Sequence, residues 1–136
     1  MRLGEKQELF ARMLPGLLNQ AVALGFEIRP GDLFRDPRLH GPPGSPDLFT
    51  WLLVKYPDIA AQAKADGYNG YGHKKSAHKN KIAIDLNLRY RNGNMAESTE
   101  DHRALGEWWE KQHELCRWGG RFADGNHYSL WHEGMM

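Results

Sequence analysis

Two short stretches of the chain carry side chains able to bind a metal ion and activate water. The first contains His78 and Asp85, and the second contains Asp124 and His127. Two imidazoles and one carboxylate that leave a fourth position open form the ligand set of a catalytic zinc, whereas a structural zinc closes all four positions. These stretches predict a site for one Zn²⁺ ion held by His78, Asp85 and His127. Asp124 is then a spare carboxylate beside the metal.

The alternation of residues 82–88 predicts where Asp85 points. Aliphatic residues at every second position alternate with Ala83, Asp85 and Asn87. Because successive side chains of a strand point to opposite faces, one face is apolar and bound to the core. The other face carries Asp85 in mid-strand, with the small Ala83 leaving room beside it.

His78 lies an odd number of residues before Asp85. A single straight strand would therefore place the two side chains on opposite faces. We expect His78 to lie on the loop that enters the strand and to bend back over the Asp85 face. Ser76 is predicted to orient His78, since a ligating histidine usually donates its second N–H to an oxygen partner.

Apolar periodicity and turn residues predict the remaining elements. We expect a helix over residues 6–24, kinked or split at Pro15. A second helix is expected from Asp47 to about Ala65, broken near Pro57, and a third from Ser98 or Thr99 to about Cys116. Short extended pieces are expected at 26–28 and 32–35. Residues 118–122 should give a tight, Gly-permitted approach to Asp124. A last strand should open at His127, with Ser129 on the same face.

These elements predict an α+β fold, with a small antiparallel sheet that carries the zinc site and packs against two or three helices. The Pro- and Gly-rich segment 36–47 is predicted to be a loop or lid. Tyr68 and Tyr71 lie in a second loop, where they either line a groove or pack a turn. His102 and His113 are about three helical turns apart and cannot share a metal ion, so both are interpreted as exposed or packed histidines.

Composition favours one soluble globular domain over residues 1–136. The chain is 40% hydrophobic and 26% charged, with a formal net charge of +1, which gives no reason to expect nucleic-acid binding. No run is long enough to span a membrane, and the N-terminus lacks the apolar segment of a signal peptide. We therefore expect synthesis in the cytoplasm without a signal peptide. Cys116 is the single cysteine, which excludes an internal disulfide and predicts a buried structural thiol.

The two stretches also carry a family resemblance. The pattern Ser-x-His-(x)4-Ala-x-Asp-Leu begins at Ser76, and Trp-Gly-Gly-Arg-Phe at 118–122 precedes Asp-x-x-His at 124–127. This order and spacing resemble the zinc peptidases that cut bacterial cell-wall peptides. They comprise the VanY-type D-alanyl-D-alanine carboxypeptidases and the L-alanyl-D-glutamate endolysins of phages. The likeness is good over 76–131, weak over 5–35 and poor over 36–73.

The resemblance implies roles for individual residues. The family places its general base three residues before the last His, a position that Asp124 occupies here. Arg35 matches a family Arg that would hold a substrate carboxylate, with Arg29 as second candidate. Arg35 and Ser76 are thus the predicted substrate-binding residues. The alternative for Arg35 is a surface residue or one paired with a neighbouring aspartate.

The resemblance also implies a function. We expect a zinc metallopeptidase that hydrolyses peptidoglycan stem peptides, acts as a monomer and reaches the wall through a holin pore. An L-alanyl-D-glutamate endopeptidase of the phage endolysin type is favoured, because the small chain with its 118–122 segment resembles the phage enzymes most closely. The alternatives are a D-alanyl-D-alanine carboxypeptidase, a non-catalytic zinc-containing binding module resembling the hedgehog domains, and a protein without metal.

Overall fold

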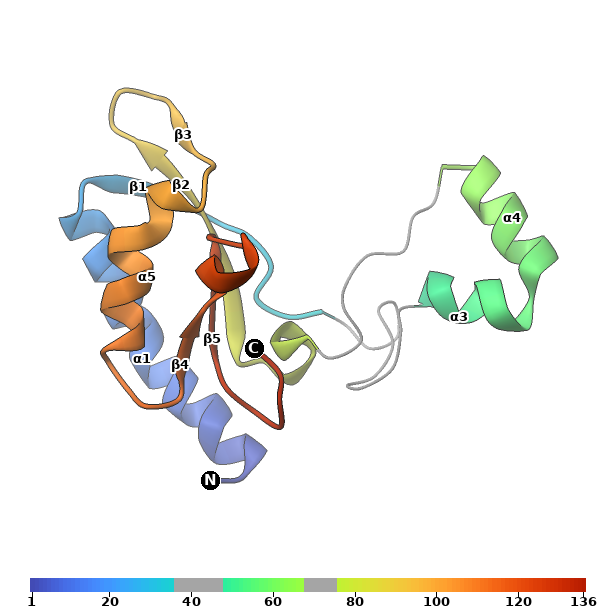
Figure 1. The fold of residues 1–136 in the computed structure, drawn as a ribbon, viewed down its shortest axis with the longest axis horizontal. Coiled ribbons are helices and arrows are strands. Elements are labelled where there is room, and N and C mark those ends of the chain that lie inside the picture. Colours follow the sequence, from blue (N-terminus) through green and yellow to red (C-terminus); the bar gives the residue numbers. More distant parts are fainter. Residues whose placement is uncertain (36–47, 68–75) are drawn as a thin grey trace.

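A computed structural model describes residues 1–35, 48–67 and 76–136. It confirms the α+β class: a five-stranded sheet, antiparallel throughout, lies against helices (Figure 1). The predicted loop or lid at 36–47, the start of the second helix at Asp47, and Tyr68 and Tyr71 lie outside the described residues.

The long strand β2 (Ala83–Tyr90) is the centre of the sheet. The strand order is β1-β2-β5-β4, and β3 also pairs with β2. Because β1 and β3 both pair with Leu88 and Arg89, they flank β2 on opposite edges. The shorter strands are β1 (Phe26–Pro30), β3 (Met95–Ala96), β4 (Cys116–Trp118) and β5 (His127–Leu130).

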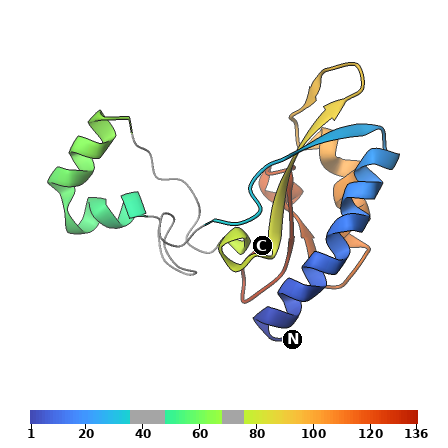
Figure 2. The same ribbon diagram turned by 180° about the vertical axis from the view of Figure 1, so that it is seen from behind.

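Two helices, α1 (Leu3–Ala23) and α5 (Arg103–Glu110), pack against the sheet (Figures 1 and 2). The core between them is apolar, and the Phe10 and Trp109 rings meet edge to face with centroids 6.2 Å apart. Leu86 and Leu88 of β2 are fully buried in this core. Burial of each such side chain stabilises the fold by roughly 1.5–3 kcal/mol. Since the strand alternates, Asp85 points away from this core, as the sequence predicts.

α1 continues through Pro15 as one helix, so of the two predicted alternatives, a kink or a split, the split is wrong. Proline removes one backbone hydrogen bond, but Pro15 is exposed, where water can satisfy the freed carbonyl. Leu14, Leu17 and Leu18 pack on the core around this point and hold both halves of the helix in line.

The third predicted helix is too long. It begins as a 3₁₀ turn, η2 (Glu100–His102), and α5 ends at Glu110, whereas Cys116 opens strand β4. Leu105 and Trp109 form its buried face. The next positions on that face are Gln112 and His113, whose polar side chains cannot extend an apolar contact.

The predicted extended piece at 32–35 is not part of a strand. Its contact with the sheet is a backbone hydrogen bond from Asp85 N–H to the Asp32 carbonyl, 2.8 Å long. The following bend at Leu33 turns the chain away from β2.

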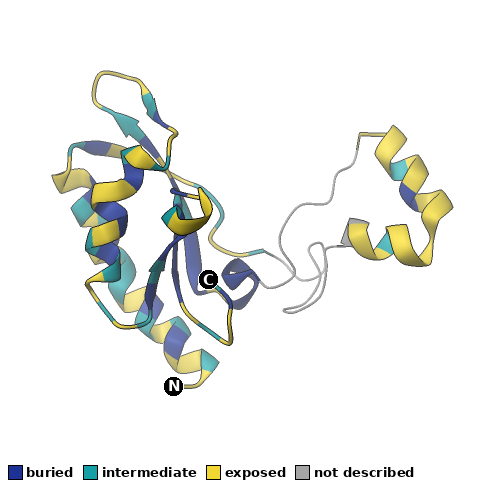
Figure 3. Cartoon of the chain, in the orientation of Figure 1, coloured by how far each residue is buried: buried dark blue, intermediate teal, exposed yellow. Residues whose placement is uncertain are grey.

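The second predicted helix is broken where expected. α3 (Leu48–Lys55) and α4 (Pro57–Ala65) are separate helices, with Pro57 in the first turn of α4. Trp51 and Ile59 are more than two-fifths exposed, and most described residues of these two helices are exposed (Figure 3). Across the described ranges, no helix has the length and apolarity needed to cross a bilayer.

The thiol of Cys116 should be unreactive in the folded protein. Cys116 is 2% exposed, and burial raises the pKa of the thiol to about 12. A raised pKa means that almost no thiolate, the reactive form, exists at pH 8. We expect no labelling by iodoacetamide at pH 8 in native protein and complete labelling in urea, measured by intact mass. Rapid labelling of folded protein would contradict this assignment.

Candidate metal centre

His78 reaches the Asp85 face from a short helical turn. It lies on the 3₁₀ helix η1 (Ala77–Asn80), directly before β2. The Ser76 hydroxyl accepts the His78 backbone N–H at 3.3 Å, and Arg35 N–H donates to the His78 carbonyl at 3.3 Å. Lys81, with a left-handed φ of 58°, then turns the chain into the strand. The predicted bend of His78 over the Asp85 face is therefore present.

Asp85 and His127 are directly opposite each other on paired antiparallel strands. Opposite residues share a face, with Cβ atoms about 4.5–5.5 Å apart. Besides the bond from Asp85 N–H to Asp32, Gly31 N–H donates to the Asp85 carbonyl at 2.8 Å. Both backbone hydrogen bonds of Asp85 thus go to the 31–32 segment, on the edge of β2 opposite to β5.

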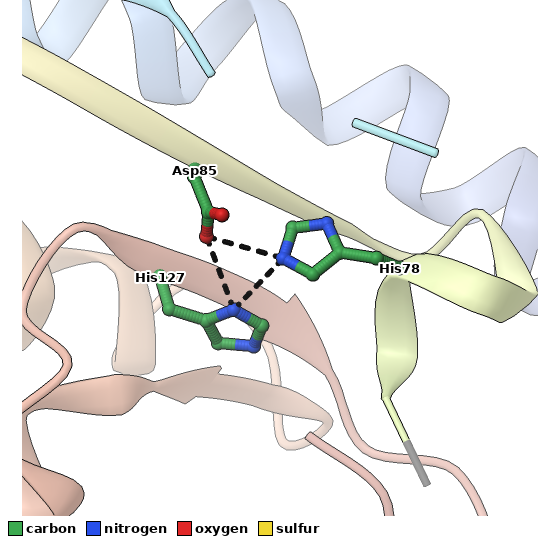
Figure 4. A group of neighbouring side chains, drawn as sticks. All are labelled: His78, Asp85 and His127. Atoms are coloured by element: carbon green, nitrogen blue, oxygen red, sulfur yellow. Dashed lines mark hydrogen bonds and ion pairs between the residues drawn. The ribbon is translucent and has the colours of Figure 1, made fainter. Parts of the chain in front are cut away.

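The three predicted ligands converge on one point (Figure 4). His78 Nε2 lies 3.1 Å from both Asp85 Oδ1 and His127 Nδ1. His127 Nδ1 lies 3.3 Å from the same carboxylate oxygen. Tetrahedral zinc with bonds of 2.0–2.2 Å separates its ligand atoms by about 3.3–3.6 Å. The triangle formed by His78 Nε2, Asp85 Oδ1 and His127 Nδ1 therefore needs only a slight expansion to hold the ion.

With Asp85 ionised, hydrogen bonds alone leave one repulsive contact in this triangle. If both ring nitrogens carry hydrogen and donate to Asp85, their two N–H groups face each other across 3.1 Å. If only one carries hydrogen, the lone pair of the other faces the carboxylate oxygen. A cation at the centre attracts all three lone pairs at once, so the arrangement fits a metal ion.

The surroundings of the triangle are buried. His78 is 1% exposed and His127 is 7% exposed. Within the described ranges, three buried side-chain atoms lack a hydrogen-bond partner: His78 Nδ1, His127 Nε2 and Ser129 Oγ. Ser129 lies on the same strand face as His127, two residues further along β5. In the described part of the chain, the buried side-chain atoms without a hydrogen-bond partner thus belong to two of the predicted metal ligands and to Ser129.

The carboxylate is held in its ligating form. Burial by itself raises the pKa of Asp85, but hydrogen bonds from His127 and His78 and their charges outweigh burial and hold this pKa well below its usual range. Asp85 is therefore an anion at neutral pH, the state that metal binding requires.

A cavity of about 460 Å³ lies beside the triangle. Both imidazoles line it, together with Asp124, Arg35 and Ser76. The structure thus brings the predicted base and both predicted substrate-binding residues to one cavity. Arg29 is an exposed residue of β1 and is not among the lining residues.

Arg35 pairs with a neighbouring aspartate and also lines the cavity. Its Nε donates to Asp32 Oδ2 at 3.2 Å, which is the neighbouring aspartate pair, and its Nη1 donates to Ser76 Oγ at 2.9 Å. The guanidinium also lines the cavity. Among the described residues, His78 Nδ1 has no hydrogen-bond partner, so the prediction that the Ser76 hydroxyl orients this imidazole by accepting its second N–H is wrong. The hydroxyl receives the His78 backbone N–H instead, because the turn of η1 brings that group closest.

A tight turn holds Asp124 next to His127. Asp124 N–H donates to the Gly119 carbonyl at 3.0 Å, and His127 N–H donates to the Asp124 carbonyl at 3.1 Å. A Cβ on Gly119 would overlap the Asp124 carbonyl and lie 2.9 Å from His127 Cβ. The Gly-permitted approach predicted from Trp-Gly-Gly-Arg-Phe is confirmed. The Asp124 side chain is exposed.

Two parts of the site were not found in the sequence. Gly31 packs against Asp85, where a Cβ would lie 3.0 Å from Asp85 Cβ, and its position after Pro30 was the available signal. Ser129 was assigned to the His127 face, but nothing in the sequence marked its hydroxyl as unpartnered. His102 is a packed histidine, as predicted: it accepts from Tyr128 Oη at 2.8 Å and donates to the Ala96 carbonyl at 2.9 Å.

Comparison with known proteins gives no relative: no protein-family model, curated protein or solved structure matches this chain. The geometry shows a group that could hold a metal ion. The identity of the metal, the family and the activity stay predictions.

Metal content tests the triangle directly. We expect one zinc ion per chain in protein purified without chelator, measured by plasma mass spectrometry, and loss of at least nine-tenths of it in His78→Ala and His127→Ala. A missing ligand typically costs more than the 10–100-fold in affinity that a lost outer-shell partner costs. His113→Ala, at a partly buried site outside the triangle, should keep the metal. Equal zinc content in all four proteins would exclude this site.

Proposed function

We propose that this protein is a zinc metallopeptidase that hydrolyses peptidoglycan stem peptides. The observation that carries the proposal is the triangle of His78, Asp85 and His127 beside a cavity lined by Asp124 and Arg35. Three protein ligands with an open fourth position are typical of catalytic zinc. The residue pattern resembling wall-cutting zinc peptidases supplies the substrate class.

The chemistry divides between the metal and the chain. A zinc ion bound by the three ligands would lower the pKa of a water ligand to near ~7 and polarise a substrate carbonyl. Asp124 is the proton carrier: its carboxylate, exposed at the cavity, accepts a proton from the attacking water and passes it to the leaving amine. The backbone bonds of Asp124 to Gly119 and His127 fix the main chain of this residue relative to the ligands.

Arg35 and Ser76 position the substrate. The Arg35 guanidinium is held at Nε and Nη1 by Asp32 and Ser76. A guanidinium fixed in this way can bind a carboxylate with little further loss of side-chain entropy. Binding a substrate carboxylate at this end of the cavity orients a short peptide over the ligands.

The favoured scissile bond is L-Ala–D-Glu, because the chain resembles the phage enzymes most closely in its 118–122 segment. The D-Glu residue also carries a carboxylate that Arg35 could hold. A D-alanyl-D-alanine carboxypeptidase would use the same groups on a terminal carboxylate. A zinc-containing binding module is less favoured, because a general-base candidate lines the cavity.

Digestion of purified peptidoglycan tests the proposed function. We expect mass spectrometry to show new amino termini on D-Glu, absent after chelation and restored by added zinc. Release of free D-Ala instead would assign the carboxypeptidase. No product from several wall types, in protein that holds zinc, would favour the binding module and overturn the peptidase proposal.

Replacement of Asp124 tests the base. Asp124→Asn keeps the size of the side chain but removes its ability to accept a proton, so turnover should fall by about 10²–10⁴-fold. Zinc content should stay at one ion per chain, since Asp124 is outside the ligand triangle. Glu114→Gln, a matched change away from the cavity, should be fully active. A zinc-loaded Asp124→Asn protein with normal turnover would refute the assignment.

A further inference from the structure

A second cavity continues the ligand-bearing face of the sheet. It has a volume of about 290 Å³ and shares Asp124 with the first cavity. Asn87, two residues beyond Asp85 on the same strand face, lines it, as does Asn126, which directly precedes His127. The two cavities therefore share Asp124, and His78 and His127 line the first of them.

The lining of this second cavity suits a peptide main chain. Asn87 and Asn126 each offer an amide that both donates and accepts, and Thr99 adds a hydroxyl. Met95 and Ala123, which are partly or fully exposed, give the cavity apolar surface. These groups match the alternating N–H, C=O and small side chains of an extended peptide. His102 also lines the cavity, but both its ring nitrogens are already hydrogen-bonded within the protein. It therefore has no free ring nitrogen to bind a peptide.

The two cavities differ in charge. The first contains the Arg35 guanidinium. The second contains Glu97, and none of the described residues lining it is Lys or Arg. A peptide with a carboxylate at one end is therefore favoured in one orientation, with that carboxylate at Arg35 and its uncharged end near Glu97.

We propose that the second cavity is a subsite for the main chain on the amino-terminal side of the scissile bond. This inference rests on the proposed function. The bound peptide runs from Asn87 and Asn126, past Asp124 and the ligands, to Arg35, and an uncharged, acylated amino-terminal extension binds better than a free short peptide.

Binding of inert ligands tests this subsite without requiring turnover. The short ligand is Ala-D-Glu, and the long ligand is acetyl-Ala-Ala-Ala-D-Glu, both with the bond before D-Glu reduced to CH₂–NH so that it cannot be hydrolysed. In nuclear magnetic resonance titrations of the zinc-loaded chain, the long ligand should bind about tenfold more tightly. Two gained hydrogen bonds suffice for this ratio. Only the long ligand should shift the side-chain amide signals of Asn87 and Asn126.

Variants identify the residues responsible. The double variant Asn87→Ala, Asn126→Ala should bind both ligands within about twofold of each other, since the extension loses its hydrogen bonds. Asn19→Ala, an exposed position on α1, should keep the tenfold ratio. Thr99→Val provides a milder variant should the double variant lose zinc or unfold, and it should reduce the ratio about threefold.

The outcomes separate the subsite from the peptidase. Equal affinity of the two ligands for the unaltered chain, or a tenfold ratio that survives in the folded variants, would overturn the subsite even if wall peptides are cleaved. The other outcome is a tenfold ratio of affinities that the variants abolish, in a protein that cleaves no wall peptide. That result would support the second cavity as a peptide-binding subsite and would refute only the proposed peptidase activity.

Discussion

The pairing of Asp85 with His127 across two antiparallel strands is the constraint on which the site depends. A shift of one residue in this register would turn one of the two side chains to the opposite face of the sheet. The apolar side chains of β2 prevent such a shift, because Leu86 and Leu88 would then leave the core under α1 and α5. The same burial that stabilises the sheet therefore fixes two of the three ligands. Only His78 comes from outside the sheet, and its position depends on the turn of η1.

Much of the site could be predicted because it follows from short-range rules. The period of two along a strand gave the direction of Asp85, and the odd spacing placed His78 on a turn before the strand. The Gly-Gly approach to Asp124 was readable because close backbone contacts exclude a Cβ. The α+β class followed from the same periodicities. Zinc itself, the catalytic role of Asp124 and the family go beyond what these rules decide.

The errors arose where tertiary contacts overrule local pattern. Periodicity alone extends the third helix to Cys116, but the strand partner of Cys116 is Leu130 on β5, far away in sequence. Pro15 signals a break, yet core contacts on both sides keep α1 continuous. Ser76 was assigned to the imidazole by proximity in sequence. Its hydroxyl instead bridges the backbone of η1 and the Arg35 guanidinium, a partner 41 residues away.

The ligands also join parts of the chain that are distant in sequence. His78 and His127 are separated by 49 residues, and they meet only when η1, β2 and β5 are all in place. An ion bound between them acts as a cross-link, because η1 cannot leave the sheet without breaking a metal bond. Binding energy of this kind adds to the free energy of unfolding in proportion to RT ln(1 + [metal]/Kd). The supply of metal would thereby set the balance between native and unfolded chains, and an environment poor in that metal would enlarge the unfolded population.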